Sequence, residues 1–292
     1  MKEDYQKKIL IFGVGLSGRA VFRKLNQEAD FKIIGFVDNF YNENNNFFFN
    51  KKVYSPSQIS LIEYDLIVLS GRDIDEIKNQ LLDDLRIPEN KFLILTKSDL
   101  MPSDIVREYT EESIIEILTI LTNMMNNENI SYWMDFSALL AIHRKVDFSN
   151  FSDVDIAINS QNDAKSIFDA MSKFKQFKLK KKLIDEKLNY AKIGDIMQIS
   201  IESSVDLLIQ EPAIIDIHLK FLHDDIYKCP VGKYSLYTPF ECLNGYEVIK
   251  YKNLPLRIPL NSKGYLELIY GKFWEKPIEN WKSGDYGNIL DE

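Results

Sequence analysis

The pattern of apolar and polar positions divides the chain into two parts of different character. In the first part, short apolar runs typical of buried parallel strands alternate with segments of helical spacing. The expected elements are strands at 8–12, 32–37, 65–69 and 92–96, with a helix ending near 25 and another over 75–85. This alternation of strand and helix predicts an α/β domain with a parallel sheet in residues 1–98.

The second part opens with a long amphipathic helix and continues with strands that contain acidic residues. We expect the helix from Glu111 to about Met125, because its apolar residues recur at helical spacing. Pro102 lies in the segment before it, so residues 99–110 are expected to link the first domain to a second domain over 111–292. The further expected elements are a strand–turn–helix at 132–144 and strands at 152–158 and 213–219.

Two aspartates interrupt the apolar strand at 152–158. Asp153 and Asp155 are two residues apart, so in a strand their side chains lie on the same face. At about 5 Å and an effective dielectric of about 20, the two charges repel by roughly 3 kcal/mol, a cost that a shared divalent cation would remove. Paired oxygen ligands beside space for phosphate are typical of Mg²⁺ in phosphoryl-transfer sites. A second Asp-x-Asp, at Asp73 and Asp75, opens a helical pattern and is interpreted as structural.

Further candidate residues lie in or near the neighbouring predicted strands. Asp216 stands inside an apolar run, where an unpaired carboxylate is costly, so we interpret it as a metal ligand or as the base for an acceptor hydroxyl. Asp206 is the alternative third acid, and Asp135 ends the short strand before the turn. His218 shares a face with Asp216, which favours a hydrogen-bonding role there. Arg144 follows the turn by one helix and is a candidate for bidentate binding of phosphate.

A strand–turn–helix unit followed by an Asp-x-Asp strand and a third acid on another strand is the pattern of the nucleotidyltransferase fold. Two further segments narrow the comparison: Trp133-x-Asp135-x-x-x-Leu139-Leu140…Arg144 and Pro259…Tyr265-Leu266…Tyr270-Gly271…Trp274…Pro277. Over roughly residues 110–281, the chain resembles the LicD family. Members of that family transfer a phospho-substituent, such as phosphocholine or ribitol phosphate, from a CDP-linked donor to a glycan.

The resemblance implies a fold, an activity and a set of ligands. The fold is a C-terminal nucleotidyltransferase-fold α+β domain, and Mg²⁺ or Mn²⁺ is the expected cofactor. The implied partners are a CDP-linked donor and a glycan or lipid-linked glycan acceptor. The expected catalytic groups are Asp153, Asp155, Asp216 and Asp135, of which the first three are also the expected metal ligands. The expected substrate-binding groups are Ser137, Arg144, His218, Tyr270 and Trp274.

The chain departs from that family at the turn before the helix. Ser137 and Ala138 stand where Gly-Thr is usual, and Ala141 stands where another glycine is common. A glycine in this turn lets main-chain N–H groups approach phosphate, so Ser137 is expected to offer its hydroxyl instead. Phe151 and Ser152 occupy the position where many relatives carry another acid.

The first domain carries a nucleotide-binding pattern of its own. Gly13, Gly15 and Gly18 follow a buried strand and open a helix, and Asp38 ends the next strand. This is the dinucleotide fingerprint of a Rossmann-like domain, in which the acid faces a ribose 2′-hydroxyl. NAD or another nucleotide is therefore the candidate ligand, with NAD favoured over NADP because Asp38 would repel a 2′-phosphate. A scaffolding domain that has retained its glycines is the alternative.

Composition matters mainly for what it excludes. The net charge of −8 and the pI near 5.1 argue against nucleic acid as the main partner. Cys229 and Cys242 are too few for a disulfide framework, and the three histidines show no zinc-type spacing. Without a signal-peptide pattern or a long apolar run, we expect a cytoplasmic protein. A lipid-linked acceptor would place it at the inner face of the membrane through peripheral contact.

Two surface segments also stand out. Residues 40–50 are rich in asparagine and aromatic residues and are interpreted as a loop that forms a contact surface. A basic run with interleaved apolar residues is either a solvated face or a contact for an anionic glycan or lipid head group. Its lysines are Lys173, Lys175, Lys178, Lys180, Lys181, Lys182 and Lys187.

Three other functions stay open. The same fold could move NMP from an NTP to a small acceptor, which would release pyrophosphate rather than CMP. The first domain could be the active part of an NAD-dependent sugar-nucleotide enzyme. A non-catalytic sensing or assembly protein is favoured by the missing glycines at Ser137 and Ala141. The sequence leaves the transferred group, the acceptor glycan and the oligomeric state open.

Overall fold

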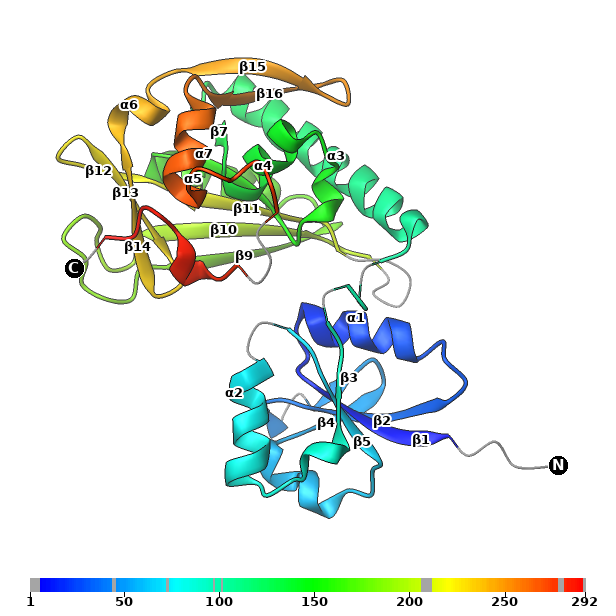
Figure 1. The fold of residues 1–292 in the computed structure, drawn as a ribbon. Helices are drawn as coiled ribbons and strands as arrows, with labels where there is room; N and C mark the ends of the chain where they lie inside the picture. Colours follow the sequence, from blue (N-terminus) through cyan, green and yellow to red (C-terminus); the bar gives the residue numbers. More distant parts are fainter. Residues whose placement is uncertain are drawn as a thin grey trace. The chain divides into compact units, whose positions relative to one another are not determined.

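The computed structural model describes residues 6–43, 46–71, 74–96, 98–100, 102–205, 212–277 and 281–290. Asp73 and Asp206 lie outside these described residues. The chain forms two compact units, which divide in sequence between Ser103 and Asp104 (Figure 1). Each unit is a mixture of helices and strands around its own main sheet, so the protein has the two-part α/β and α+β construction that the sequence predicts.

The first unit is built on a six-stranded sheet in the order β3-β4-β2-β1-β5-β6. Its strands are β1 (Lys7–Phe12), β2 (Phe31–Val37), β3 (Phe47–Phe48), β4 (Lys51–Tyr54), β5 (Leu66–Leu69) and β6 (Phe92–Ile94). All neighbouring strands are parallel except β3 and β4. The last four residues of β1 are buried, as a parallel strand covered on both faces requires. The expected Rossmann-like parallel sheet is confirmed.

Helices cover both faces of this sheet. Helix α1 (Leu16–Leu25) packs on the side of Ile9. Leu10 faces a second core on the other side of the sheet, against which Ile77 of helix α2 (Ile74–Asn79) packs. Helix α2 continues as a π-helical turn that ends at Asp84. Short 3₁₀ segments over Pro56–Leu61 and Glu89–Lys91 complete the connections.

The prediction of a loop with a contact surface at residues 40–50 is partly wrong. The β3–β4 hairpin includes its second half, and two of its aromatic residues pack inward. The ring of Phe48 lies 5.1 Å from that of Phe36, and the ring of Phe49 lies 4.6 Å from that of Phe22. These side chains therefore close the apolar core at one end of the sheet.

The second unit begins with helix α3 (Asp104–Asn127), which starts earlier than the expected Glu111. An aspartate in the first turn favours the early start, because it interacts well with the positive end of the helix dipole. The predicted apolar stripe is present, since Ile114 and Leu121 are buried. Residues 104–110, predicted as part of a linker, are helical.

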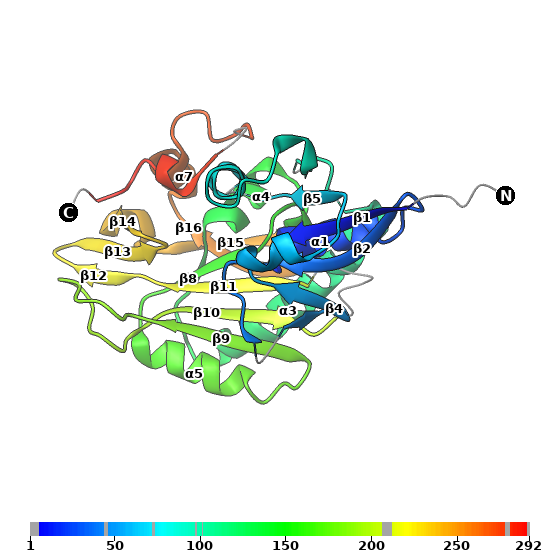
Figure 2. The same cartoon turned by 90° about the horizontal axis from the view of Figure 1, so that it is seen from below.

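The main sheet of the second unit has the order β7-β8-β11-β10-β9. Its strands are β7 (Trp133–Met134), β8 (Val154–Ile158), β9 (Phe177–Leu183), β10 (Ile196–Ser203) and β11 (Ile214–Leu219). Strands β8 and β11 are parallel, and the other neighbours are antiparallel. Helix α5 (Gln161–Met171) packs against β9, the edge strand, and β10 (Figure 2).

Side chains on this sheet alternate between an apolar face and a polar face. Ile156, Ile199 and Ile217 are buried in the core that α3 and α5 share with the sheet. The positions between them in β8 and β11 carry Asp155 and Asp216. The period of two that the sequence analysis used therefore holds, and it collects the acidic residues on the face away from those two helices.

The remaining elements build around the polar face and the far end of the sheet. Helices α4 (Phe136–Arg144) and α7 (Ser262–Tyr270) pack on each other, and α4 also packs on β8. The others are β12 (Phe221–His223), β13 (Ile226–Val231), β14 (Tyr234–Pro239), α6 (Phe240–Leu243), β15 (Tyr246–Tyr251) and β16 (Leu254–Pro259). Across the described ranges, the structure has no helix that combines the length and apolarity needed to span a membrane.

Candidate functional site

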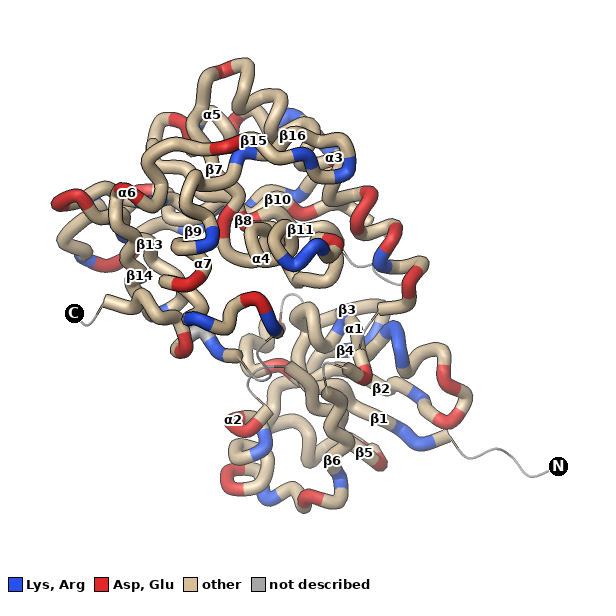
Figure 3. Tube along the Cα trace, turned by 45° about the horizontal axis from the view of Figure 1, so that its top comes forward, with Lys and Arg blue, Asp and Glu red and all other residues tan. Residues whose placement is uncertain are grey.

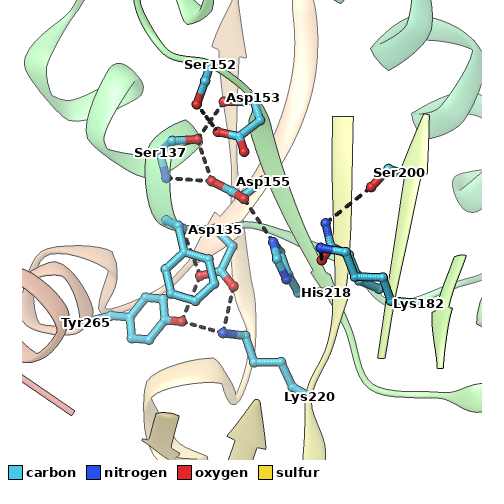
Figure 4. Close-up of polar contacts among 12 residues, drawn as sticks. Asp135, Ser137, Ser152, Asp153, Asp155, Lys182, Ser200, His218, Lys220 and Tyr265 are labelled. Atoms are coloured by element: carbon cyan, nitrogen blue, oxygen red, sulfur yellow. Dashed lines mark hydrogen bonds and ion pairs between the residues drawn. The ribbon is translucent and has the colours of Figure 1, made fainter. Parts of the chain in front are cut away.

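Three carboxylates gather on the polar face of the second sheet. Asp155 of β8 and Asp216 of β11 are register partners on adjacent parallel strands. Asp153 lies just before β8, two residues from Asp155, and both are drawn in Figure 4. Asp155 is only 6% exposed, and the Oδ1 atom of Asp216 is buried without a hydrogen-bond partner among the described residues. The structure thus brings together the three acids that the sequence singled out.

The Asp155 carboxylate is held on both of its oxygens. Its Oδ2 accepts a hydrogen bond of 2.9 Å from the main-chain N–H of Ser137 and another from the Ser137 hydroxyl. Its Oδ1 lies 3.0 Å from Nε2 of His218, so the hydrogen bond of His218 is to Asp155 rather than to Asp216, beside which it was expected (Figure 4). The Ser137 hydroxyl also lies 2.8 Å from the carbonyl oxygen of Asp153. Ser137 therefore links the Asp155 carboxylate to the main chain of Asp153. Its N–H and hydroxyl groups bind these oxygens rather than a phosphate.

Crowding of like charges shows in the acid–base properties of the cluster. Burial, followed by the charges of Asp155 and Asp216, raises the pKa of Asp153 to about 7. Burial by itself lowers the pKa of His218, but its hydrogen bond to Asp155 and the nearby carboxylates raise that pKa overall. The site thus carries more negative charge than the protein groups around it neutralise.

The three carboxylates have some of the properties of a metal-binding site. Carboxylate oxygens and excess negative charge suit a hard divalent cation. Within the described part of the chain, however, no three His, Cys, Asp or Glu side chains converge as a ready-made metal site. Asp155 already uses both oxygens, while Asp216 retains an unpartnered one. The donor set fits Mg²⁺ or Mn²⁺ in its chemistry, but the side chains do not close around an ion.

A buried ion pair, which the sequence analysis missed, lies beside the acids. Lys220 and Asp135 are each 1% exposed, and Lys220 Nζ lies 2.7 Å from Asp135 Oδ2. Tyr265 of α7 joins both, because its hydroxyl donates to Asp135 Oδ1 at 2.7 Å and accepts from Lys220 Nζ at 2.7 Å. Spacing offered a signal for Lys220, since Asp216, His218 and Lys220 follow one another at i, i+2.

Asp135 also fixes the start of helix α4. It is the N-cap residue, and its carboxylate accepts a hydrogen bond from the N–H of Phe136 at 3.0 Å. Its own N–H donates to the carbonyl of Asp155 at 2.9 Å. Phe136 has a φ of +30°, a costly conformation for a residue with a side chain. The turn therefore stores strain next to the acids, and the buried pair holds it in place.

Arg144 has a different role from the phosphate contact expected of it. Its Nε donates to the carbonyl of Trp274 at 3.1 Å, and its Nη2 donates to the carbonyls of Trp274 and Lys276. The guanidinium thus ties the end of α4 to the segment after α7. Trp274 is itself buried, with its ring 5.6 Å from that of His143, so it packs in the core.

Tyr270 belongs to an aromatic cluster with Trp281 and Tyr286. Burial, then the charges of Tyr286 and Asp155, raises the pKa of Tyr270 well above its usual value. Burial, followed by the carboxylates of the site, does the same for Tyr286, which the sequence analysis missed. Tyr286 contacts Phe136 of α4 with ring centroids 5.8 Å apart. This aromatic cluster therefore packs beside helix α4, near the acids.

The first unit contains the expected glycine turn. Gly13 has a φ of +98°, and a Cβ on Gly18 would lie 2.0 Å from the carbonyl oxygen of Gly13, so the fold itself requires both glycines. Gly15 has an ordinary φ, and a Cβ there would meet open space. Asp38 accepts main-chain hydrogen bonds on both oxygens, one of them from Val14 in this turn at 3.0 Å. A Cβ on Gly13 would also meet open space, so among the three glycines Gly15 alone combines open space with an ordinary φ.

A separate hollow lies along the first half of α3 and does not include the three aspartates. Glu111, one of the residues that line it, accepts hydrogen bonds from the N–H of Ser149 at 2.8 Å and from the hydroxyl of Tyr251 at 2.6 Å. Lys252 lies 3.2 Å from the same carboxylate. These contacts satisfy Glu111 and explain it as a structural group.

Comparison with known protein families gives a match for the first unit. Residues 5–93 match the family model described as C2185-like, N-terminal. The search of curated proteins finds no match. These findings do not support the LicD resemblance, which therefore stays a hypothesis.

Several solved structures show low similarity. UDP-D-quinovosamine 4-dehydrogenase from Vibrio fischeri is 20% identical over 35% of this chain and 82% of its own, with a TM-score of 0.26. The lincomycin-bound lincosamide adenylyltransferase LnuA is 15% identical over 53% of this chain and 84% of its own, with a TM-score of 0.32. The antibiotic-resistance factor ANT(2'')-Ia is 11% identical over 54% and 66%, with a TM-score of 0.26. At these levels, the similarities transfer no activity to this chain.

The buried ion pair leads to a stability prediction. Lys220→Met should destabilise the second unit by about 3–5 kcal/mol, because it leaves the Asp135 carboxylate buried without its cation. Asp135→Asn combined with Lys220→Met should cost less than the sum of the two single changes. Urea unfolding followed by circular dichroism measures both. Lys187→Met, at an exposed lysine, is the control and should stay within about 0.5 kcal/mol; equal losses in the two lysine variants would contradict the prediction.

The raised pKa of Asp153 leads to a pH prediction for the metal-free protein. Asp153 ionises near 3.8 in the unfolded chain and at about 7 in the folded one, so folding takes up a proton between these values. The free energy of unfolding should therefore fall as the pH rises through this window. Asp153→Asn should flatten that dependence in unfolding series run with a chelator, whereas Asp185→Asn, at an exposed position, should not. A wild-type slope in Asp153→Asn would show that another group is responsible.

Proposed function

We propose that the second unit transfers a phospho-substituent from a CDP-linked donor to a hydroxyl of a glycan and releases CMP. The observation that carries the proposal is the cluster of Asp153, Asp155 and Asp216 on the polar face of the mixed sheet. Their mutual repulsion and the unpartnered oxygen of Asp216 are costly for a purely structural site. The strand–turn–helix before Asp155 supports the nucleotidyltransferase-like interpretation.

Asp153, Asp155 and Asp216 would hold Mg²⁺ or Mn²⁺. The ion would neutralise charge on the donor diphosphate during transfer. Since Asp155 is fully hydrogen-bonded in this structure, it would have to release Ser137 or His218 to bind an ion directly.

Asp216 is the proposed base. Its Oδ1 has no hydrogen-bond partner among the described residues, so it can accept the proton of an acceptor hydroxyl. The hydroxyl oxygen then bonds to the phosphorus of the transferred group, and the bond from that phosphorus to the CMP oxygen breaks. CMP leaves with the electron pair of that bond.

Two neighbouring groups position the acids. His218 orients Asp155 through its Nε2, and Asp135 holds the first turn of α4 through Lys220 and Tyr265. Preorganised charge of this kind is what transfer chemistry needs, because it is already oriented when charge develops on the reacting phosphate. The LicD resemblance supports the choice of a CDP-linked donor, with phosphocholine or a polyol phosphate as the transferred group.

For the first unit, we propose a nucleotide ligand at the glycine turn, with NAD as the first candidate. Open space at Gly15 supports this proposal. Asp38 would contact the ribose only after exchanging one of its present main-chain hydrogen bonds.

The proposed activity predicts that Asp153→Asn and Asp155→Asn proteins that still fold lose at least about 100-fold of metal-dependent CMP release. The assay follows CMP from CDP-choline, CDP-glycerol and CDP-ribitol, with and without Mg²⁺. Asp75→Asn is a matched control, because it belongs to the other Asp-x-Asp, at the start of α2, and should leave the rate unchanged.

The same assay identifies the competing reaction. Pyrophosphate released from CTP or ATP, with no CMP from the CDP-linked donors, would replace phospho-substituent transfer by nucleotidyl transfer. Unchanged CMP release in both aspartate variants would refute the assigned site.

A further inference from the structure

Side chains alternate between the two faces of the main sheet of the second unit. This alternation brings the aspartates to one face, and it places lysines on the same face. In the register of β9, β10 and β11, Lys180 pairs with Ser200, and Ser200 pairs with Asp216. Asp216 in turn pairs with Asp155 of β8. Register partners on adjacent strands point to the same side of a sheet. A single row of side chains therefore runs from the acids to the edge strand.

A second row runs parallel to the first. Lys182 pairs with Gln198, which pairs with His218. Lys182 Nζ donates to Gln198 Oε1 at 2.9 Å, and Gln198 Nε2 donates to the Ser200 hydroxyl at 3.2 Å, so the two rows are linked (Figure 4). Lys181, between the two lysines, lies on the opposite face, with its Nζ 4.9 Å from the ring centre of Phe168 in α5.

Both lysines on the acidic side keep positive charge available. The side chain of Lys180 is 71% exposed, and its contact with Glu202 is long, at 3.4 Å. Lys182 is exposed and donates to a neutral amide. Lys220, by contrast, is buried against Asp135. Figure 3 marks the lysine, arginine, aspartate and glutamate residues along the described part of the chain.

The separation between Lys180 and Asp216 in the first row leaves room for a diphosphate between them. Strands lie about 4.8 Å apart, so the Cα atoms of Lys180 and Asp216, two strands apart, are separated by roughly 10 Å. Ser200 lies between them and adds a hydroxyl. The groups that the sequence suggested for phosphate, Ser137 and Arg144, already bind Asp155 and main-chain carbonyls.

We propose that Lys180 and Lys182 bind the diphosphate of the donor across the sheet from the three aspartates. The inference deepens the proposed function and rests on it for the identity of the donor, whereas binding of the diphosphate itself can be tested separately. Lysines on an edge strand also prevent pairing with other chains. That protective role does not distinguish Lys180 and Lys182 from Lys181, whereas diphosphate binding does.

The test is isothermal titration of the full chain with inorganic pyrophosphate and with CDP, each in the presence of Mg²⁺. A charge-assisted hydrogen bond typically contributes about 1.5–3 kcal/mol, so Lys180→Ala and Lys182→Ala should each weaken binding at least about tenfold. The double variant should weaken it about 100-fold or more. Lys180→Arg should retain most of the affinity, because it keeps the charge.

Lys181→Ala is the matched control, since it removes an exposed lysine from the same strand but from the opposite face, and its affinities should equal those of the wild type. Equal affinities in Lys180→Ala, Lys182→Ala and the wild type would overturn the inference, as would equal weakening in all three alanine variants. Absence of binding by the wild type would overturn it as well. Pyrophosphate binding that depends on these lysines, with no turnover of any CDP-linked donor, would support the inference while refuting the proposed function.

Discussion

The alternation of side chains across one mixed sheet is the constraint on which the second unit depends. Ile215 and Ile217 of β11 enter the core under α3 and α5, and Asp216 between them must then face the other way. A register shift of one residue would turn the acid into the apolar core and both isoleucines to the polar face, so packing alone fixes the position of the carboxylate. The same rule in β8 brings Asp155 next to it. Core and site are therefore two consequences of one periodicity.

Negative charge is compensated unevenly around this site. Lys220 compensates Asp135, and His218 shares a hydrogen bond with Asp155. The Asp153 carboxylate accepts a hydrogen bond from the hydroxyl of Ser152, but burial and the charges of Asp155 and Asp216 raise its pKa. The compensated acids are those that hold the turn of α4, whereas the uncompensated ones border the polar face. The proposed cation would lie at this uncompensated part of the site.

How much of this could be predicted depended on the range over which the residues interact. The shared face of Asp153 and Asp155 and the glycine turn at Gly13 follow from neighbouring positions, and the structure contains both. The role of Arg144 could not be predicted, because its partners are main-chain carbonyls more than a hundred residues away, which leave no trace in side-chain type. Lys220 was only partly predictable. Its spacing from the acids was visible, but its burial depended on the packing of α7.

Ser137 explains why the site differs from a glycine-lined phosphate loop. With a glycine, the turn would offer only main-chain N–H groups; here the serine hydroxyl adds contacts to Asp155 and to the carbonyl of Asp153. These contacts hold the acids together, but they leave fewer free N–H and hydroxyl groups in the turn for a phosphate. Positive charge for an anionic substrate must then come from another element. Strand β9 provides it, because its register places Lys180 and Lys182 on the acidic face. In the proposed function, the serine in the turn and the lysines at the edge are parts of the same electrostatic arrangement.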